Sequence, residues 1–323
     1  MKKQIFAAVG AVALTLGLTA CSATEDDKLT ISLVPSTEGE DLAEALGPLT
    51  DYLSEQMGVE VEGVVASDYA ATVEALGAGQ SDAIITDAGS LYNAMEQHNA
   101  ELILRDVRFG ATSYSSVAYT NTPDKYCEDE PTLATYAAAD TEMAYCNGIE
   151  PGETATGEGP AAVEQLGKIT GDTSVVLQSS TSPAGYQYPV VAMEEEGVNI
   201  DDVNQIPVEG NNNAVLALAN GDGEVAFGFW DARSSVMEEN PDVATDVVAF
   251  AYTEQIPNGG VAVRSDLDTE LKDKLTEAMD SYAESSDEAA SVMYDLVGLS
   301  DWTADTQEED INRYGEILEY FSK

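Results

Sequence analysis

Hydrophobic and polar residues recur with two different periods along this chain, and segments of the two kinds follow one another. Short apolar runs rich in β-branched residues are typical of strands, and we expect strands at 29–34, 59–65 and 83–86. Between these runs the apolar positions recur every three to four residues, which predicts helices over 41–53 and 68–76. Strands that alternate with helices are typical of an α/β fold with a mostly parallel sheet.

The same alternation returns in the middle of the chain, after a longer strand-like segment at 114–119. A second strand-like segment, 247–252, ends this middle part, and three amphipathic helices follow from Asp268 onward. Within the middle part we predict helices and strands in turn, at 161–169, 174–177, 204–208, 214–219 and 225–229.

The two strand-like segments divide the predicted elements into two groups. We expect one lobe from residues 29–119 together with 253–323, and a second lobe from residues 120–252. Two crossings between two lobes are the arrangement of a hinged clamp, which closes on a small ligand between its halves.

Residues 121–159 interrupt the alternation. They are polar, rich in Glu, Asp, Gly and Thr, and they contain Cys127 and Cys146. We interpret this stretch as an insertion into the second lobe that lies on the surface, where loops of this composition are normally found. A partner-binding role for the insertion stays open beside a purely structural one.

The N-terminus has the features of an export signal. A basic start precedes an apolar stretch, 5–20, that is too short to span a bilayer comfortably, and no later run is long and apolar enough to do so. The sequence Leu18-Thr19-Ala20-Cys21 resembles the lipobox of bacterial lipoproteins. By that resemblance residues 1–20 are a signal peptide, Cys21 carries the lipid, and residues 21–28 tether the protein to the extracytoplasmic face of the cell membrane. An ordinary secretory signal is the alternative.

Export makes the cysteine count informative. With Cys21 carrying the lipid, Cys127 and Cys146 remain as a pair in an oxidising compartment, and we expect a disulfide between them. A ring of this size stabilises a fold by about 3 kcal/mol. Two cysteines without a nearby histidine give little reason to expect a metal site.

The charge of the chain excludes one class of partner. Sixty Asp and Glu residues stand against thirteen Lys and Arg residues, for a formal net charge of −47. A nucleic-acid partner needs a basic surface, so we expect none. The acidic residues are spread evenly, which indicates a surface that stays hydrated in a salty medium. A halotolerant source and an ordinary acidic exported protein both fit this composition.

Candidate chemistry is concentrated where predicted strands end. Ser180, Thr181 and Ser182 precede Pro183 and an apolar helix pattern, so they lie at a helix N-terminus. Free backbone N–H groups, the helix dipole and short hydroxyl side chains make such an end a site for an anion. An ordinary helix cap with additional serines is the competing interpretation.

These residues belong to a longer pattern that resembles a known family, the phosphate, phosphite and phosphonate substrate-binding proteins of ABC importers (the PhnD-like group). The resemblance implies a two-lobed periplasmic-binding-protein-like (type II) fold, an ABC permease as partner and no cofactor. It covers nearly the whole mature chain, and its motifs are Val34-Pro35-Ser36, Asp68-Tyr69-Ala70-Ala71, Tyr114-Ser115-Ser116, Ser180-Thr181-Ser182 and the segment from Asn220-Gly221 to Asp231.

The resemblance also implies a ligand site. The Ser180–Ser182 hydroxyls and helix amides would hold the phosphorus oxygens, while Tyr69 and Tyr114 donate hydrogen bonds and exclude water. Asp231 would accept a hydrogen bond from a protonated P–OH group or pair with an ammonium group. For the tyrosines a packing role competes, and for Asp231 a helix cap. Weaker candidates for ligand contact are Ser36, Ser90, Tyr186 and Trp230.

Three departures from the family pattern leave the ligand open. Pro183-Ala184 follows the serines where a glycine is usual, Asp87-Ala88-Gly89 replaces a Gly-Pro pair, and Asn211 stands where a histidine is expected. Phosphate, phosphite and phosphonates therefore remain alternatives.

The same residues leave two other functions to consider, a different binding protein and an enzyme. Tyr69, Tyr114, Trp230 and Asp231 would also suit a cationic or zwitterionic solute such as a quaternary amine. An enzyme has little support, because the lone His98 lies in a polar helix end and the sequence has no Ser-His-Asp set or metal-binding cluster. We expect a monomeric binding protein.

Overall fold

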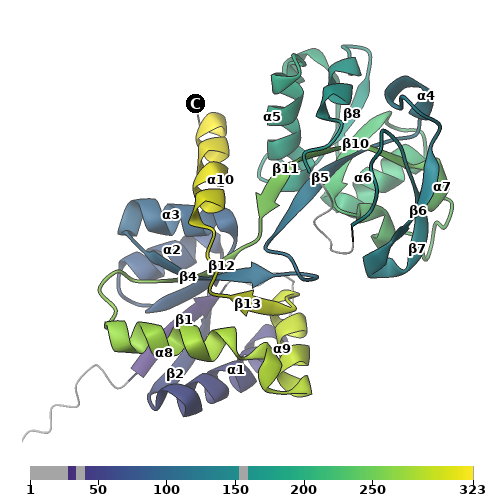
Figure 1. Cartoon of the computed structure of the whole chain (residues 1–323). Helices are drawn as coiled ribbons and strands as arrows, with labels where there is room; N and C mark the ends of the chain where they lie inside the picture. Colours follow the sequence, from purple (N-terminus) through teal and green to yellow (C-terminus); the bar gives the residue numbers. More distant parts are fainter. Residues whose placement is uncertain (1–27, 34–40, 153–158, 323) are drawn as a thin grey trace, which may run out of the picture.

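The computed structural model describes residues 28–33, 41–152 and 159–322, which form two α/β lobes (Figure 1). Each lobe is built around its own sheet, so the predicted fold class is confirmed. The signal peptide, Cys21 and Ser36 lie outside the described residues. None of the described helices is long and apolar enough to cross a membrane.

The first lobe contains a six-stranded sheet in the order β13-β4-β12-β3-β1-β2. Strand β1 pairs in parallel with both β2 and β3, while β12 runs antiparallel between β3 and β4. The strands are β1 (Lys28–Leu33), β2 (Glu60–Val65), β3 (Ala83–Thr86), β4 (Glu101–Val107), β12 (Gly260–Val263) and β13 (Asp301–Thr303).

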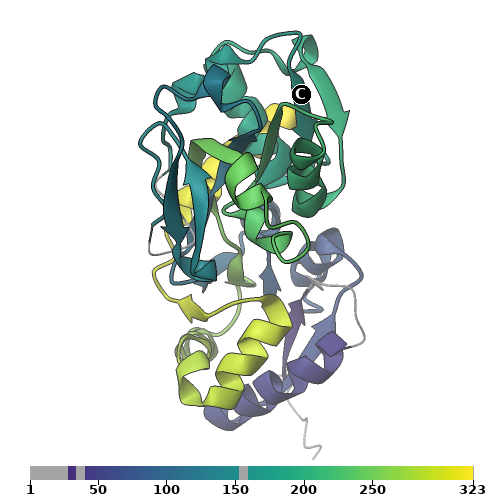
Figure 2. The ribbon, with the colours of Figure 1, turned by 90° about the vertical axis from the view of Figure 1, so that its right-hand side faces the viewer.

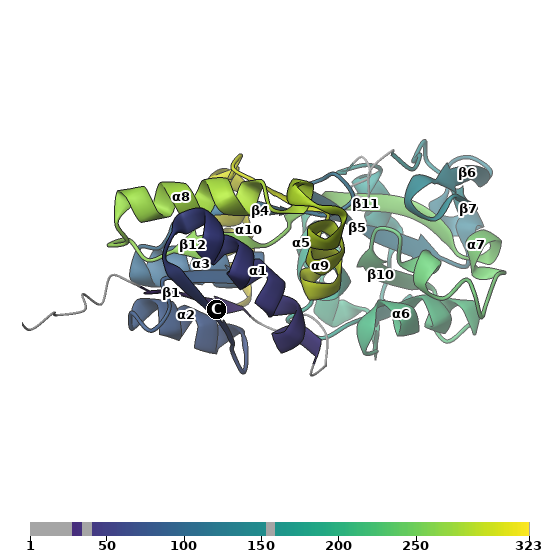
Figure 3. The same ribbon diagram turned by 90° about the horizontal axis from the view of Figure 1, so that it is seen from below.

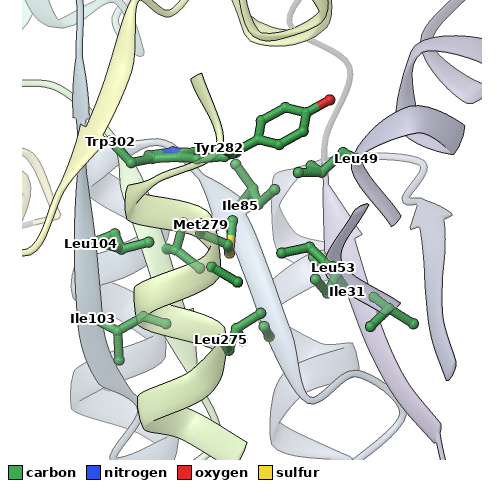
Figure 4. Packing of buried hydrophobic residues seen from close by; sticks show 14 of the residues in the cluster. Ile31, Leu49, Leu53, Ile85, Ile103, Leu104, Leu275, Met279, Tyr282 and Trp302 are labelled. Atoms are coloured by element: carbon green, nitrogen blue, oxygen red, sulfur yellow. The ribbon is translucent and has the colours of Figure 1, made fainter. Parts of the chain in front are cut away.

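Helices cover both faces of this sheet (Figure 3). Because side chains alternate along a strand, Ile85 of β3 faces one layer and Ile84 the other. Figure 4 shows the first layer, where Leu53 and Met279 pack over Ile31 and Ile85. The helices are α1 (Asp41–Met57), α2 (Tyr69–Gly77), α3 (Ala88–His98), α8 (Thr269–Asp280), η7 (Ala283–Ser285), α9 (Asp287–Val297) and α10 (Glu308–Phe321).

The second lobe contains a seven-stranded sheet in the order β6-β7-β11-β5-β10-β8-β9. Strands β8, β9 and β10 are parallel to one another, and β5 runs antiparallel to its neighbours. The strands are β5 (Ser113–Thr120), β6 (Thr132–Tyr136), β7 (Thr141–Tyr145), β8 (Ser174–Leu177), β9 (Asn204–Pro207), β10 (Val225–Phe229) and β11 (Val248–Pro257).

The second sheet is also covered on both faces. One layer contains α6 and α7, and the other contains α4, α5 and the short helix η3. The helices are α4 (Pro123–Tyr126), η2 (Ala137–Ala139), η3 (Val163–Lys168), η4 (Pro183–Gln187), α5 (Tyr188–Glu195), η5 (Ile200–Asp202), α6 (Gly210–Ala219), η6 (Ala232–Ser235) and α7 (Val243–Asp246).

Both crossing segments belong to the second sheet. Strands β5 and β11 pair with each other from Thr120 and Val248 to Ser113 and Pro257. The expected lobe boundaries at 119/120 and 252/253 fall inside these strands. The chain instead leaves the first sheet after Val107 and rejoins it at Gly260, because the crossing strands find their hydrogen-bond partners in the second lobe.

The described part of the 121–159 segment is not a surface insertion, and this prediction was wrong. Strand β7 pairs with β11, so the β6–β7 hairpin extends the sheet of the second lobe. Tyr136, Met143 and Tyr145 are buried in the same core as Val117 of β5. Polar residues dominate the composition of the segment, but Met143 and Tyr145, which lie two residues apart on β7, both face this core.

The expected disulfide is present between Cys127 and Cys146, with a Cα–Cα distance of 5.6 Å. It joins the end of α4 to the end of β7, next to a stacked pair formed by Tyr126 and Phe250. The bond therefore ties the hairpin to the second lobe from within its core.

Helix α10 connects the lobes on one side (Figure 2). A hydrophobic cluster joins Leu91 of α3 and Ile311 of α10 to Ala184 and Tyr188 of the second lobe. The two lobes thus share an apolar contact in addition to the two crossing strands.

Candidate functional site

The polar ends of parallel strands meet at one edge of each sheet. In the first lobe, β1, β2 and β3 end together, and helices α2 and α3 begin after β2 and β3. In the second lobe, β8, β9 and β10 end together, and they lead into η4, α6 and η6. Ligands of α/β sheets are held beyond such edges, where loops and helix N-termini converge.

Residues 178–182, which we call the hydroxyl loop, follow β8 and lead into η4. Ser179, Ser180 and Thr181 are exposed, and Ser182 is half-buried. Ser182 caps the helix, because its Oγ accepts a hydrogen bond of 3.1 Å from the amide of Gly185. The hydroxyls of Ser179 and Thr181 lie 2.9 Å apart. The predicted trio is therefore a contiguous set of hydroxyl groups at a helix start.

Gln178 fixes the base of this loop. Its Nε2 donates to Oδ1 of Asn211 at 2.9 Å and to the carbonyl of Phe227 at 3.2 Å. Gly185 allows the approach, because a Cβ there would lie 2.3 Å from Cδ of Gln178. Asn211 also accepts from the amide of Phe229, so the start of α6 and the end of β10 are linked to the loop. Asn211 was noted only as a departure from the family pattern, and Gln178 was not among the predicted site residues.

The two predicted tyrosines share their charged neighbours in the first lobe. Tyr69 begins α2 and is 46% exposed, while Tyr114 is half-buried on β5. Burial raises the pKa of both phenols, Asp87 raises it further and Arg108 opposes the rise; the pKa of Tyr114 reaches about 12. Both phenols therefore stay protonated at neutral pH and can donate a hydrogen bond.

Asp87 is a group that the sequence analysis did not include in the site. It caps α3, and its Oδ1 accepts from the amides of Gly89 and Ser90 at 2.8 and 3.2 Å. Asp68 caps α2 in the same way through the amide of Ala71. Both helix starts in the first lobe thus carry a carboxylate, whereas the helix start after the hydroxyl loop carries a neutral hydroxyl. The signal was available in the sequence, because Asp87 follows a buried strand.

Asp231 is fully buried in the second lobe. Arg233 pairs with it at 2.6 Å between Nη2 and Oδ2, and both side chains are 0% exposed. The hydroxyls of Tyr119 and Tyr145 donate to the same carboxylate at 3.2 and 3.1 Å. Protein donors therefore surround the group that was predicted to face a ligand.

The positive charge of Arg233 is balanced by the carboxylate of Asp231. Burial alone would lower the pKa of its guanidinium, but Asp231 raises it above the ordinary value. Its Nη1 also donates to the carbonyls of Ala144 and Val247, both at 2.7 Å. The pair consequently joins β7 and the start of β11 to the segment after β10.

The weaker candidates are dispersed. Trp230 is 1% exposed and packs edge-on against Tyr136 and Tyr252. Tyr186 packs against Phe321 of α10, with ring centroids 5.8 Å apart. Ser90 is buried in the first turn of α3, beside Asp87. Of these residues, Ser90 lies next to Asp87, the carboxylate that neighbours both Tyr69 and Tyr114.

A cavity of about 530 Å³ opens at the crossing segments, with Thr112, Gln255 and Gln307 in its lining. None of the predicted ligand residues lines it. We assign the candidate site to the strand ends, because the hydroxyls, helix starts and phenols there are chemically suited to an anion, whereas Asp305 and Asp310 in the cavity are not.

Two α/β lobes joined by paired crossing strands, with polar groups at the strand ends, define a two-lobed substrate-binding protein. The chain belongs to the family described as "ABC transporter, phosphonate, periplasmic substrate-binding protein", which matches residues 31–309. Members of this family bind and deliver a substrate to a transporter and are not enzymes.

Known relatives agree with this assignment. The phosphate-import protein PhnD of Mycolicibacterium smegmatis is 24% identical over 291 residues, which are 83% of this chain and 79% of the relative. PhnD1 from Prochlorococcus marinus, solved in complex with methylphosphonate, has a TM-score of 0.61 and 14% identity, with 92% of this chain and 99% of that one covered.

A binding protein component of an ABC phosphonate transporter from Pseudomonas aeruginosa has a TM-score of 0.55 and 18% identity. The comparison covers 90% of this chain and 85% of that chain. At such identities the likeness to the two solved structures establishes the two-lobed fold, which is the fold predicted from the sequence.

Proposed function

We propose that the chain is the lipid-anchored receptor of an ABC importer and that it captures a small phosphorus oxyanion between its two lobes. Phosphonate, phosphite and phosphate are the candidate ligands. The observation that carries the proposal is the exposed hydroxyl loop at a helix start that has only a neutral cap. We further propose that the receptor acts as a monomer and delivers its ligand to a membrane permease.

The two lobes offer complementary chemistry to such a ligand. In the second lobe, Ser180, Thr181 and the helix start provide hydroxyl and amide donors for anionic oxygens. On the other side, Tyr69 of α2 and Tyr114 of the crossing strand β5 provide two more donors beside the carboxylate of Asp87 in the first lobe. Closure of the lobes would bring both sets to one ligand and exclude water from it.

Asp87 takes the role that the sequence analysis gave to Asp231. A carboxylate only accepts hydrogen bonds, so it favours a ligand with a P–OH group or an ammonium group over a fully ionised anion such as sulfate. Asp231 is already paired with Arg233, whereas Asp87 is half-buried next to the predicted tyrosines. This arrangement favours a protonated phosphorus oxyanion or an aminoalkylphosphonate.

A receptor for a quaternary amine fits less well. The aromatic cage considered for it needs Trp230 and Asp231, and these side chains are 1% and 0% exposed. Only Tyr69 and Tyr114 of that set are accessible to a solute. Without the buried pair, two phenols do not surround a cation.

Calorimetric titration tests the proposal. Protein from Ser22 onward is titrated in high salt with phosphate, phosphite, methylphosphonate, aminoethylphosphonate, sulfate and choline. We expect one-to-one binding of one phosphorus ligand, weakened about tenfold or more by Thr181→Ala, because a hydrogen bond to a charged group is lost. Thr245→Ala, at an exposed position of helix α7, is the matched control and should bind as the wild type does. Binding of choline alone would overturn the assignment.

The anchor has a separate test. In cells that produce the full chain, Cys21→Ser should move the protein from the membrane fraction to the soluble fraction. Retention of the variant in the membrane fraction would contradict lipidation at this residue.

A further inference from the structure

A hydrogen-bond relay connects helix α10 to the hydroxyl loop. The hydroxyl of Tyr314 donates to Oε1 of Gln187 at 2.8 Å, and Nε2 of Gln187 donates to the carbonyl of Ser180 at 3.2 Å. Tyr314 is 4% exposed and Gln187 is 5% exposed, so water does not compete for these bonds. The relay ends on the backbone of the proposed ligand-binding trio.

Tyr314 belongs to the first lobe by its packing. Helix α10 lies closely on α3, because Gly315 leaves room for the ring of Tyr92, which a Cβ there would approach to 2.1 Å. The ring of Tyr314 itself packs at the start of α3, where its Cε1 would lie 3.4 Å from a Cβ on Gly89. The backbone amide of Gly89 donates a hydrogen bond to the carboxylate of Asp87, which caps α3. Tyr314 therefore contacts the site-forming helix start of the first lobe directly.

The same side chain also faces the second lobe. Its ring lies 5.7 Å from the ring of Tyr188 at the start of α5. The preceding turn, η4, is held within its own lobe, because Ser116 Oγ on β5 donates to the carbonyl of Ala184 at 2.6 Å. Gln187 links the hydroxyl loop to the first lobe by hydrogen bonds.

We propose that Gln187 and Tyr314 are positioning residues that set the backbone of the hydroxyl loop according to the placement of the first lobe. The inference rests on the proposed function of the loop. Neither residue touches the ligand, but the affinity for the ligand depends on both. The helix starts at Gly89 and at Ser182 are coupled through this relay.

The relay acts on affinity through preorganisation. A loop that is held in its binding conformation loses less conformational entropy when a ligand arrives. If only a fraction of molecules hold the loop correctly, the apparent Kd rises by the inverse of that fraction. Loss of one uncharged buried hydrogen bond corresponds to about three- to tenfold weaker binding.

The first experiment removes one hydroxyl group. Tyr314→Phe keeps the ring and its contact with the ring of Tyr188 but loses the donor to Gln187. Tyr92→Phe is the matched control, because it removes a hydroxyl that donates to Glu319 on the same helix at an exposed position. In titrations with inorganic phosphate and with methylphosphonate, Tyr314→Phe should bind about three- to tenfold more weakly and Tyr92→Phe should equal the wild type.

Hydrogen exchange separates the relay from the function of the loop. In ligand-free protein, Tyr314→Phe should speed amide exchange within 180–182, whichever ligand the protein takes. If the wild-type protein binds neither phosphate nor methylphosphonate, the proposed function is overturned, and with it the expected effect on affinity. Wild-type protein that binds a probe, with Tyr314→Phe equal to Tyr92→Phe in affinity and exchange, would overturn the relay alone.

A pH titration distinguishes positioning from general packing. In Gln187→Glu, an ionised carboxylate still accepts from Tyr314 but cannot donate to the carbonyl of Ser180. Once protonated it regains that donor, so affinity relative to the wild type at the same pH should recover as pH falls through the pKa of the introduced carboxylate. Burial raises that pKa. A relative affinity that does not change with pH would contradict the proposal.

Discussion

At the scale of single residues, the buried pair of Asp231 and Arg233 has the largest energetic consequences. Both charges are removed from water, and each is balanced by the other and by neutral donors or acceptors from distant strands. Removal of one partner leaves the other charge buried without a counterion, which is much more costly than removal of both.

We therefore expect Asp231→Ala to lower the free energy of unfolding by about 3–5 kcal/mol. Replacement of both residues, in Asp231→Leu with Arg233→Met, should cost less than the single change. Urea unfolding at pH 7 measures both values. A stable Asp231→Ala protein that has lost ligand binding would instead restore Asp231 to the ligand-contact role first predicted for it.

Asp106 makes stability depend on pH. Burial raises the pKa of its carboxyl to about 6, against the opposing effects of Arg108 and of the 2.9 Å hydrogen bond from Nε1 of Trp302. Below about pH 4 the group is protonated in both folded and unfolded chains, so it costs nothing. As pH rises through 6 the folded state must carry a buried charge, and stability from this group is lost.

Asp106→Asn keeps the acceptor for Trp302 but cannot ionise. We expect the variant to be more stable than the wild type by about 2–3 kcal/mol at pH 7 and equal to it near pH 3.5. Urea unfolding at the two pH values gives the comparison. The same difference at both values would show that ionisation of Asp106 is not its cause.

The sequence predicted residues whose environment is local. Ser180, Thr181 and Ser182 were placed at a helix start because a proline and an apolar run follow them directly, and the structure has them there. Their contact with a ligand stays a prediction. The burial of Asp231 could not be predicted, because Tyr119 and Tyr145 lie far from it in sequence and reach it only through sheet pairing.

At the scale of elements, the β6–β7 hairpin differs most from what the sequence predicted. A polar composition suggested a surface loop, yet Met143 and Tyr145 of β7 are buried in the core of the second lobe. The hairpin also positions Tyr145 against Asp231. Any partner-binding role must therefore be tested on exposed positions such as Leu133, because deletion of the segment would remove core side chains.

Loss of the disulfide should loosen this hairpin. Cys127 and Cys146 are 19 residues apart, and opening a ring of that size should lower the free energy of unfolding by about 3 kcal/mol. The double variant Cys127→Ser with Cys146→Ser, compared with oxidised wild type in urea, measures the loss. Addition of a reductant should destabilise the wild type and leave the double variant unchanged; an equal response of the two proteins would contradict this account.

The start of one C-terminal helix was predicted correctly at Asp268, whereas Asp301, which was also expected to cap a helix, begins strand β13. Asp268 accepts from the amides of Glu270 and Leu271 and begins α8, the first of the three expected C-terminal helices. The crossing segments were correctly predicted as strands, but the sheet to which they belong was not predicted. Pairing partners are chosen by long-range hydrogen bonds, which a one-dimensional pattern does not contain.

At the scale of the whole molecule, the net charge of −47 is the dominant property. Like charges repel more strongly in the compact state than in the unfolded chain, and salt screens them beyond about 10 Å at 0.1 M ionic strength. We expect the melting temperature to rise between 20 mM and 1 M sodium chloride. A melting temperature that falls as salt is added would contradict both this expectation and a halotolerant source.

The position of β12 gives the protein an order of assembly. This short strand, which is made late in synthesis, lies in the interior of the first sheet between β3 and β4. The second sheet uses only residues 113–257, all of which precede β12 in the chain. A growing chain can thus finish the second lobe first, while the first lobe remains divided into two unjoined halves. The lobe that begins the chain is the last to close.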